Sequence, residues 1–348
     1  MTRIVFINTF VNKLISLNMN RTLFACRLKA ARTIRRMSLE QLAQLVQQPV
    51  TKQSLSRYES GIMMPKPALL AAIAQALDIS CAYFEGKNLH LDTTMLRTSS
   101  GAKLTDPDLD NITSILSYHT ERFLNKELKT NMQEHFDTSL QLPAVNQFSD
   151  AMKAAHKVRK FWHCGDGPIA SVLRLCERRG IKIFESELPD HVFGLSTWAD
   201  RCHPLMLLDM RPSKTTVERL RFTAAHELGH LLLTFPEGVQ IEKLCNQFAS
   251  CFLLPGQTLI EELGGSSRDE IYLEELIDLR ELYGVSIAAL VHEAHDLHII
   301  SRQHYDWWFD TVIKHNLLEE GWGHYAFPET LGKEKRMNAR LQHLLHES

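Results

Sequence analysis

Residues 221–233 read RFTAAHELGHLLL and contain two histidines four positions apart, His226 and His230. On a helix this spacing places both imidazoles on one face, so their nitrogens can converge on a single metal ion. Glu227 projects beside them, where its carboxylate can take a proton from a water molecule held at an open coordination position. The motif alone is a weak signal, because a chain with 17 histidines can carry this spacing by chance. The rest of the chain has to supply the context.

The composition separates a basic front from an acidic body. The chain has 348 residues, enough for two or three domains, with 44% hydrophobic and 23% charged residues and a net charge of -2. Residues 21–90 carry ten Lys or Arg against four Asp or Glu, a balance of +6, and residues 1–20 add +2, so residues 91–348 carry -10. This asymmetry is typical of a nucleic-acid-binding module joined to a separate catalytic or sensing domain.

Cysteine usage and hydropathy indicate a cytoplasmic protein. The seven cysteines are scattered and form no C-x-x-C pair, which fits a reducing compartment. The sequence has no run of 18 apolar residues, so we expect no transmembrane helix and no membrane partner. Residues 1–20 are expected to be a leader, either a disordered arm or an extension ahead of a true start at Met19.

Residues 21–86 are predicted to form a domain of short helices with sharp ends. Ser38 is suited to cap one helix, and Thr51 to cap another that runs from Lys52 to Glu59 and ends before Gly61. Pro67 opens a further apolar helix. Two short helices across a tight turn make a helix-turn-helix.

The segments MSLEQLA at 37–43 and VTKQSLSRYESG at 50–61 carry a resemblance to a known family. They resemble the phage-repressor-like (Xre/Cro) DNA-binding domains, and this resemblance implies operator DNA as a partner and the helix after Thr51 as the one that enters the major groove. A homodimer is one option for such a module. The resemblance implies four residues as contacts to bases or phosphates: Lys52, Gln53, Ser54 and Arg57. Arg57 equally fits a structural role at the helix end.

The remaining chain predicts an α+β architecture, in which the all-α helix-turn-helix domain is followed by a mainly helical domain with a small sheet. Residues 87–150 read as a linker with connecting helices, 151–260 as the metal-binding domain and 261–348 as a helical extension. Strands are expected at 181–184, 192–198 and 204–210, ahead of the helix that holds the two histidines. One edge of such a sheet can hold an extended peptide through main-chain hydrogen bonds.

A third protein ligand must come from beyond the histidine helix. The next helical run, IEKLCNQFASCFLLP at 241–255, begins with Glu242, which can complete a His2Glu site if this helix doubles back. Asn246 then lies one turn further on, in a position to hydrogen-bond a ligand histidine. Glu237, on a Pro-Gly turn, is the rival ligand. Read by itself, Glu242 also fits a solvated acid at a helix start, where the helix dipole favours it.

Five ordered segments carry a second resemblance: Ile169 onward, GIKI at 180–183, GLS at 194–196, the histidine run and the run at 241–255. Together they resemble the ImmA/IrrE family of zinc metallopeptidases. The resemblance implies Zn²⁺ as cofactor, a gluzincin-like set of ligands at His226, His230 and Glu242, and Glu227 as general base. Leu244 and Cys245 stand where many relatives carry a polar residue and Ala.

The expected reaction is hydrolysis of a peptide bond. Glu227 would accept a proton from a water molecule whose pKa the zinc lowers to about 7, and would pass that proton to the leaving amine. A second donor to the oxyanion is usual, and the residues do not decide among His191, His203 and Tyr283.

The leading hypothesis is a DNA-binding regulator fused to a zinc endopeptidase that cleaves a repressor or antitoxin-like protein. The substrate class is implied by the resemblance alone. One alternative is a transcription factor whose metal domain senses or dimerises without turnover. Another is a component of a toxin–antitoxin or mobile-element stress module. Glu227 separates the first two in part, because hydrolysis needs it whereas metal binding does not.

Overall fold

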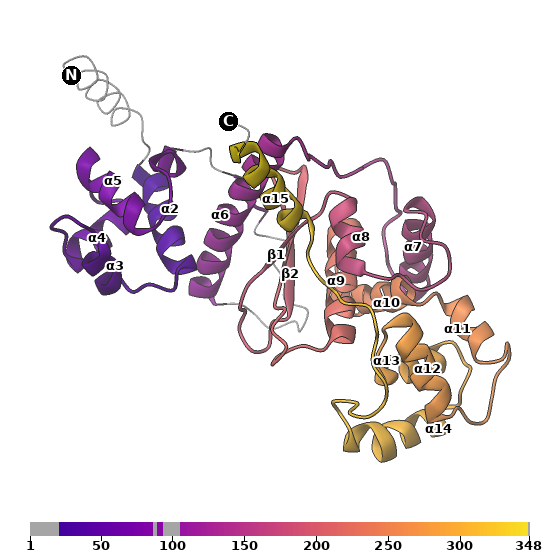
Figure 1. The fold of residues 1–348 in the computed structure, drawn as a ribbon. Coiled ribbons are helices and arrows are strands. Elements are labelled where there is room, and N and C mark those ends of the chain that lie inside the picture. The colour runs from indigo at the N-terminus through magenta and orange to yellow at the C-terminus, as the bar shows by residue number, and fades with distance from the viewer. Residues whose placement is uncertain (1–20, 86–88, 93–104, 347–348) are drawn as a thin grey trace. The chain divides into compact units, whose positions relative to one another are not determined.

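The computed structural model describes residues 21–85, 89–92 and 105–346, so the predicted leader at 1–20 lies outside the described residues. The chain divides into two compact units. The N-terminal unit comprises the chain up to Leu91 together with Thr105–Arg122, and the C-terminal unit comprises Asp92–Leu104 together with Phe123–Ser348. The domain boundaries predicted after residues 86, 150 and 260 stay predictions. Figure 1 shows the elements of both units.

The N-terminal unit is a cluster of short helices whose ends are set by local chemistry. In order they are α2 (Arg21–Ile34), α3 (Leu39–Leu45), α4 (Lys52–Glu59), α5 (Pro67–Ala76) and the 3-10 turn η1 (Cys81–Glu85). Ser38 and Gln41 form a capping box at the start of α3, and Thr51 accepts from Ser54 N at the start of α4. These caps place α3 and α4 on either side of a short turn, as a helix-turn-helix requires.

The first half of α6 (Asp106–Thr130) completes this unit. Arg27 of α2 forms an ion pair with Glu121 at 2.6 Å, and the rings of Tyr83 and Tyr118 meet edge to face with centroids 5.2 Å apart. An aromatic pair of this geometry contributes about 1 kcal/mol beyond its buried area. The helix-turn-helix therefore packs against the first half of α6, which lies in the segment 87–150 that was predicted to be a linker with connecting helices.

The C-terminal unit is built on a three-stranded sheet. Two helices, α7 (Phe148–Phe161) and α8 (Val172–Arg178), precede the strands β1 (Lys182–Glu185), β2 (Gly194–Ala199) and β3 (His203–Leu208). The sheet order is β1-β3-β2, with β1 parallel and β2 antiparallel to β3. Every residue of β2 and β3 except Trp198 and His203 is buried, because helices cover the sheet. This sheet among helices confirms the predicted α+β class.

Two long helices follow the sheet and carry the histidine motif and its expected partner. Helix α9 (Val217–Leu232) packs on β2 and β3, and α10 (Ile241–Leu253) packs on α9 and α7. Thr216 caps α9 by accepting from Arg219 N. Nearly all of α9 is buried, so the motif lies inside the unit and not on its surface.

The C-terminal helices share one hydrophobic core with the sheet and α9, a core that runs from Val145 to Ile313. These helices are α11 (Gly256–Glu262), α12 (Leu273–Tyr283), α13 (Ile287–Asp296) and α14 (Arg302–Trp307). Helix α15 (Lys333–His346) follows them in the sequence. Gly284 ends α12 at φ 63°, a left-handed conformation that glycine adopts without strain. None of the described helices is long and apolar enough to cross a membrane.

The segment between α14 and α15 returns across α8 and α9 (Figure 1). Glu329 in this segment caps α8, because its carboxylate accepts from Ser171 Oγ at 2.7 Å and from the backbone N–H groups of Val172 and Leu173. The same carboxylate forms a fully buried ion pair with Arg221 of α9 at 2.6 Å. Glu329 thus anchors both α8 and the helix that carries the histidine motif.

A second buried carboxyl joins α10 to α13. Gln247 Nε2 donates to Glu293 Oε1 at 3.1 Å, and Cys251 Sγ lies 3.6 Å from the same oxygen. Burial raises the pKa of Glu293 from 4.5 to about 7. The folded unit is therefore more stable when this carboxyl is protonated. Raising the pH removes the proton and destabilises the folded unit.

Glu293→Gln is expected to stabilise the C-terminal unit at pH 8 and to have little effect near pH 4.5. Between pH 4.5, the pKa of this group in the unfolded chain, and about pH 7, its pKa in the folded protein, only the unfolded chain ionises. The free energy of unfolding of the wild type therefore falls by up to about 3 kcal/mol over this range and stays constant at higher pH. Urea unfolding can be followed by tryptophan fluorescence, because every tryptophan lies in this unit: 162, 198, 307, 308 and 322. Exposed Glu274 on α12 provides the control Glu274→Gln. A gain that is equal at both pH values would contradict the titration and indicate a packing effect.

Candidate metal centre

The histidine motif sits on the buried face of α9. His226, Glu227 and His230 are 1%, 0% and 7% exposed. Gly194 of β2 allows the strand to approach this helix, because a Cβ there would lie 2.6 Å from Thr223 Cγ2 and 3.3 Å from Glu227 Cγ. The edge strand β2 therefore runs directly against the motif.

Three candidate ligands converge at this point, one of them from α10. The Nε2 atoms of His226 and His230 are 3.0 Å apart, and the Glu242 carboxylate lies 3.2 Å from the first and 3.5 Å from the second. Among the described residues, this is the group of His, Cys, Asp and Glu side chains close enough to hold one metal ion. Two ligand atoms at tetrahedral positions, each about 2.05 Å from one zinc ion, lie about 3.3 Å apart. The observed separations match that value.

Hydrogen bonding leaves the ligand atoms free to bind a cation. His226 Nδ1 lies 2.8 Å from Asn246 Oδ1, so the nitrogen carries the hydrogen and Nε2 keeps its lone pair. Glu242 Oε2 therefore faces the lone pair of His226 Nε2, and it is buried without a hydrogen-bond partner. Lone pairs facing each other in a buried site repel unless a positive charge lies between them. The donor set therefore fits a divalent cation.

The surroundings of His230 and Glu242 also favour positive charge at the centre. Burial by itself lowers the pKa of His230, but Cys245, Glu242 and Glu227 raise it to about 11. Burial raises the pKa of Glu242, but its contacts with His226 and His230 lower it to about 2. Together the two shifts describe a site that attracts a cation.

Two contacts at this centre were not foreseen from the sequence. Cys245, beside Asn246 on α10, is close enough to His230 to help raise the pKa of that imidazole. Ser196 Oγ on β2 donates to Glu227 Oε2 at 2.6 Å. The other oxygen of Glu227, Oε1, is buried without a partner. Ser196 thus holds one oxygen of the carboxylate and leaves the second available.

The rival ligand and the candidate oxyanion donors lie elsewhere. Glu237 is exposed on its turn and does not join the cluster. Tyr283 donates its hydroxyl to Glu262 at 3.0 Å, His191 is exposed, and His203 begins β3. None of these three lines the groove that reaches His226 within the described part of the chain. The second oxyanion donor stays unassigned.

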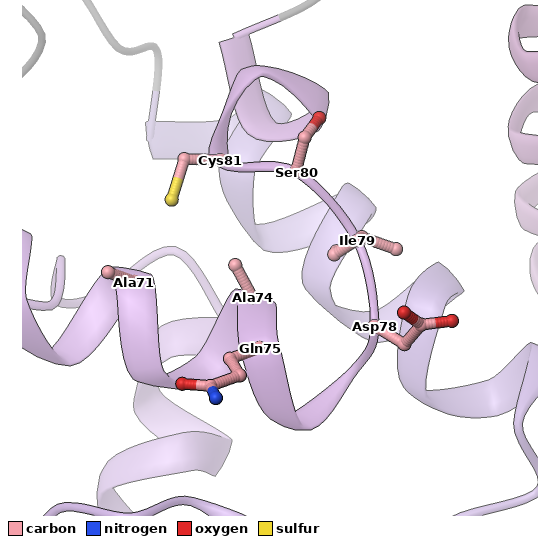
Figure 2. A pocket seen from close by; sticks show the side chains of 7 residues that line it. All are labelled: Ala71, Ala74, Gln75, Asp78, Ile79, Ser80 and Cys81. Carbon is pink, nitrogen blue, oxygen red and sulfur yellow. The ribbon is translucent and has the colours of Figure 1, made fainter. Parts of the chain in front are cut away.

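A shallow hollow on the N-terminal unit, about 460 Å³ in volume, holds no comparable set of side chains (Figure 2). Its carboxylate, Asp78, forms an ion pair with Arg35 at 3.3 Å. Its thiol, Cys81, has a pKa raised by burial, which makes it less reactive. We assign this hollow no chemistry. The residues that line it are Ala71, Ala74, Gln75, Asp78, Ile79, Ser80 and Cys81.

The expected DNA-contacting residues lie along α4 of the N-terminal unit. Lys52, Gln53 and Arg57 are exposed, and Lys52 makes a surface ion pair with Glu40 at 2.8 Å. Ser54 is only partly exposed, and its hydroxyl lies 3.0 Å from that of the cap residue Thr51. Gln53 and Arg57 are therefore exposed to a partner, Lys52 is exposed but paired with Glu40, and Ser54 is engaged at the helix start.

The N-terminal unit has the arrangement of a helix-turn-helix, and the C-terminal unit carries a candidate His2Glu metal centre. Comparison with family models identifies both parts: residues 28–84 match the helix-turn-helix family and residues 176–295 match the IrrE N-terminal-like domain. The chain is therefore a helix-turn-helix domain fused to a domain of the ImmA/IrrE family, which confirms both resemblances. No curated protein and no solved structure matches the chain.

Removing Glu242 is expected to weaken zinc binding by at least about 10- to 100-fold, since even residues that only hydrogen-bond to ligands contribute on that scale. Asn246→Ala should weaken it by about tenfold, because His226 loses the contact that orients it. Glu237→Ala is the control and should bind zinc as the wild type does. Affinities are measured by competition with a chromogenic chelator. Full affinity in Glu242→Ala would assign the third ligand to another acid.

Proposed function

We propose that this protein is an operator-binding regulator whose ImmA/IrrE-type domain is a zinc-dependent endopeptidase. The observation that carries the proposal is the meeting of His226, His230 and Glu242 with an unpartnered oxygen of Glu227 beside them. Zinc selects such a set of two imidazoles and one carboxylate, and leaves a position open for reaction. Free thiols at all seven cysteines suit work on DNA in the cytoplasm.

The chain's own residues provide the acid–base chemistry of peptide hydrolysis. When bound, zinc supplies a Lewis acid that lowers the pKa of water and stabilises negative charge on the substrate carbonyl oxygen. Glu227 Oε1 accepts the proton of the attacking water and returns it to the leaving amine nitrogen. Ser196, by donating to Oε2, orients the carboxylate so that Oε1 carries out both transfers.

The edge of the sheet provides a place for the substrate backbone. Among the described strands, β2 pairs with β3 alone, and at its far end Trp198 O already accepts from Asp92 N at 3.0 Å. An extended peptide that pairs with the beginning of β2 would lie along the strand that carries Ser196. This arrangement favours an extended segment of a protein as substrate.

A repressor or antitoxin-like protein is the substrate that the domain combination favours, because a peptidase tethered to an operator-binding module acts on proteins found at operators. The test incubates the purified full-length protein with helix-turn-helix proteins encoded near its gene. Cleavage should require zinc, stop on chelation and return when one equivalent of zinc is added back. Cleavage that persists after chelation would overturn the proposal, and so would intact substrates under every metal condition.

Replacing Lys52 and Arg57 together by Ala is expected to weaken operator binding and flatten its dependence on salt. Each lost phosphate contact removes about 0.9 from the slope of log K against log salt concentration, so the slope should fall by up to about 2. Titrations of labelled operator DNA at several salt concentrations measure this slope. Lys29→Ala, at an exposed cation on α2, is the control. An unchanged slope in the double variant would show that another face binds DNA.

A further inference from the structure

A groove of about 680 Å³ leads to the candidate metal centre along one face of α9. Arg219, Phe222 and His226 follow one another at helical spacing on that face, and Asn246 lies beside His226. The start of α13 and the loop of Leu317 and Leu318 also line this groove. A chain segment bound at the metal centre would pass through this groove.

Most of the charges in the groove are neutralised within the protein. Arg280 contacts the carboxylates of Glu218 at 3.1 Å and Glu319 at 3.2 Å. Glu319 also accepts from the backbone N–H groups of Ile287 and Ala288 at the start of α13. Both carboxylates are thereby engaged, so neither presents a free negative charge to a ligand.

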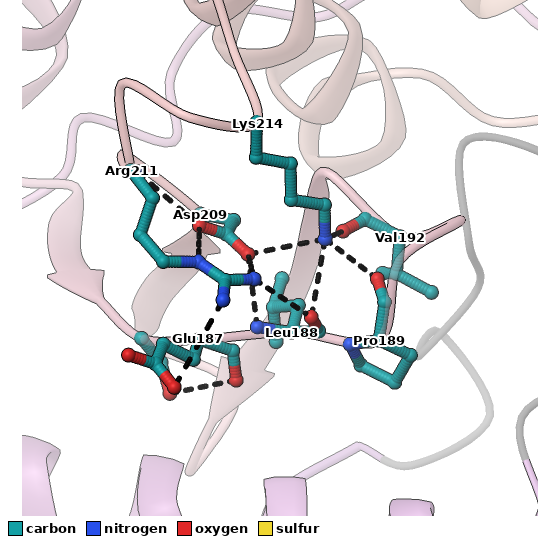
Figure 3. A network of polar contacts seen from close by, with 8 residues as sticks. Glu187, Leu188, Pro189, Val192, Asp209, Arg211 and Lys214 are labelled. Atoms are coloured by element: carbon teal, nitrogen blue, oxygen red, sulfur yellow. Dashed lines mark hydrogen bonds and ion pairs between the residues drawn. The ribbon is translucent and has the colours of Figure 1, made fainter.

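Lys214 is engaged in the same way, as Figure 3 shows. Its ammonium group lies 3.1 Å from Asp209 and donates to the carbonyl oxygens of Leu188, Pro189 and Val192. Burial opposes ionisation of Asp209, but hydrogen bonds from Arg211, Leu188 and Lys214 outweigh it and hold the pKa of Asp209 well below its usual range. The network fixes the loop that leads into β2, and it leaves no free charge on Lys214.

Arg219 differs from the other charged residues of the groove. It is exposed, and its guanidinium lies over the ring of Phe193 with Cζ 4.4 Å from the centroid. Stacking on an aromatic ring holds the group in place and leaves its N–H donors along the edge for a ligand. A planar guanidinium presented in this way matches the two oxygens of a carboxylate.

Exposed apolar side chains also line the groove. Leu317 and Leu318 are 76% and 67% exposed, and they line the groove together with the half-buried Phe222 of α9. Two neighbouring leucines of this exposure beside a binding site are typical of a surface that a ligand covers. Among the described residues that line it, the groove thus combines the exposed cation of Arg219 with apolar side chains.

Building on the proposed function, we propose that this groove selects the substrate segment next to the scissile bond by two features, an apolar side chain and a carboxylate. The apolar side chain packs between Phe222 and the leucine pair, and the carboxylate binds Arg219. The carboxylate belongs either to an Asp or Glu side chain or to the end of the substrate chain. Both sources present the same two oxygens to the guanidinium.

The test measures binding without turnover, using zinc-loaded full-length protein with Glu227→Gln and short fluorescent peptides. The peptides contain Leu followed by Glu or Gln, and each is made with a free or an amidated end. By anisotropy, the Glu peptide should bind about tenfold more tightly than the Gln peptide, the scale of a charge-assisted hydrogen bond. Adding Arg219→Ala should reduce this ratio to about one, whereas Arg302→Ala on α14 should preserve it. If peptides with a free end bind more tightly than amidated ones, whether they contain Glu or Gln, and if Arg219→Ala removes this difference, the carboxylate is that of the substrate terminus.

A second variant, Leu317→Ser with Leu318→Ser, should weaken both Leu-containing peptides by a similar factor of about ten. Equal binding of all four peptides, whichever residue follows Leu and whether the end is free or amidated, would overturn the inference. A changed oligomeric state in the leucine variant with unchanged peptide binding would also overturn it. Cleavage by the wild type separates this inference from the proposed function. Peptide binding that depends on Arg219 but is never followed by cleavage would overturn the function alone. Cleavage with no preference for carboxylates would overturn the groove assignment alone.

Discussion

Glu227→Gln should lower the rate of peptide hydrolysis by about a thousandfold and leave zinc affinity unchanged. A positioned general base contributes about 10²- to 10⁴-fold, and Gln keeps the shape of Glu while losing its ability to accept a proton. The variant can still accept the hydrogen bond from Ser196 through its amide oxygen, so the fold around β2 and α9 should persist. Zinc content is measured on the same preparations as cleavage, which separates loss of chemistry from loss of metal.

Glu237→Gln is the matched control for this experiment, because Glu237 is an exposed glutamate on the turn between α9 and α10. It should cleave at the wild-type rate. If Glu227→Gln also cleaves at the wild-type rate, Glu227 is not the general base. If both proteins bind zinc and neither cleaves any substrate, the domain is better described as a metal sensor within a transcription factor.

Arg221→Met should destabilise the C-terminal unit by about 3–5 kcal/mol, the cost of leaving one partner of a buried ion pair without the other. Arg221 and Glu329 are both fully buried. The guanidinium also donates to the carbonyl oxygens of Ile169, Tyr283 and Gly284. In an environment that excludes water, these carbonyl oxygens would lose the hydrogen bonds from the guanidinium. The Glu329 carboxylate would keep its donors at the start of α8 but lose its counter-charge. Urea unfolding followed by tryptophan fluorescence reports on this unit alone.

Arg219→Met is the control for Arg221→Met, since Arg219 occupies the same helix but is exposed. Its effect on stability should stay within about 0.5 kcal/mol, as for most surface substitutions. A loss below about 1 kcal/mol in Arg221→Met would show that the returning C-terminal segment does not depend on this ion pair. Such a result would fit buried ion pairs whose desolvation cancels their attraction.

Prediction from the sequence was most successful where structure depends on near neighbours. The caps at Ser38 and Thr51 form as expected, and so do the strands on either side of residue 200. The convergence of His226, His230 and Glu242 required the resemblance to a family, because nothing local to residues 241–255 shows that α10 folds back on α9. The structure brings the three side chains together, and their role as ligands stays a prediction for the zinc titration.

Contacts between distant parts of the chain were beyond reach of the sequence. Ser196 and Glu227 are 31 residues apart, and Arg221 and Glu329 are 108 apart. The exposed charge of Arg219 was also not predictable from the sequence. Only the structure shows that Arg280 pairs with Glu218 and that Lys214 pairs with Asp209. Each case depends on which partner a side chain finds after the whole unit has packed.

The sequence by itself determined the helix that presents two imidazoles on one face, the helix-turn-helix and the α+β class, because helical spacing and caps act over a few residues. Only the tertiary structure decided which oxygen of Glu227 is free and which charge of the groove is unpaired. Those properties arise from burial and long-range pairing, which remove water and leave each polar group with the partners that packing allows.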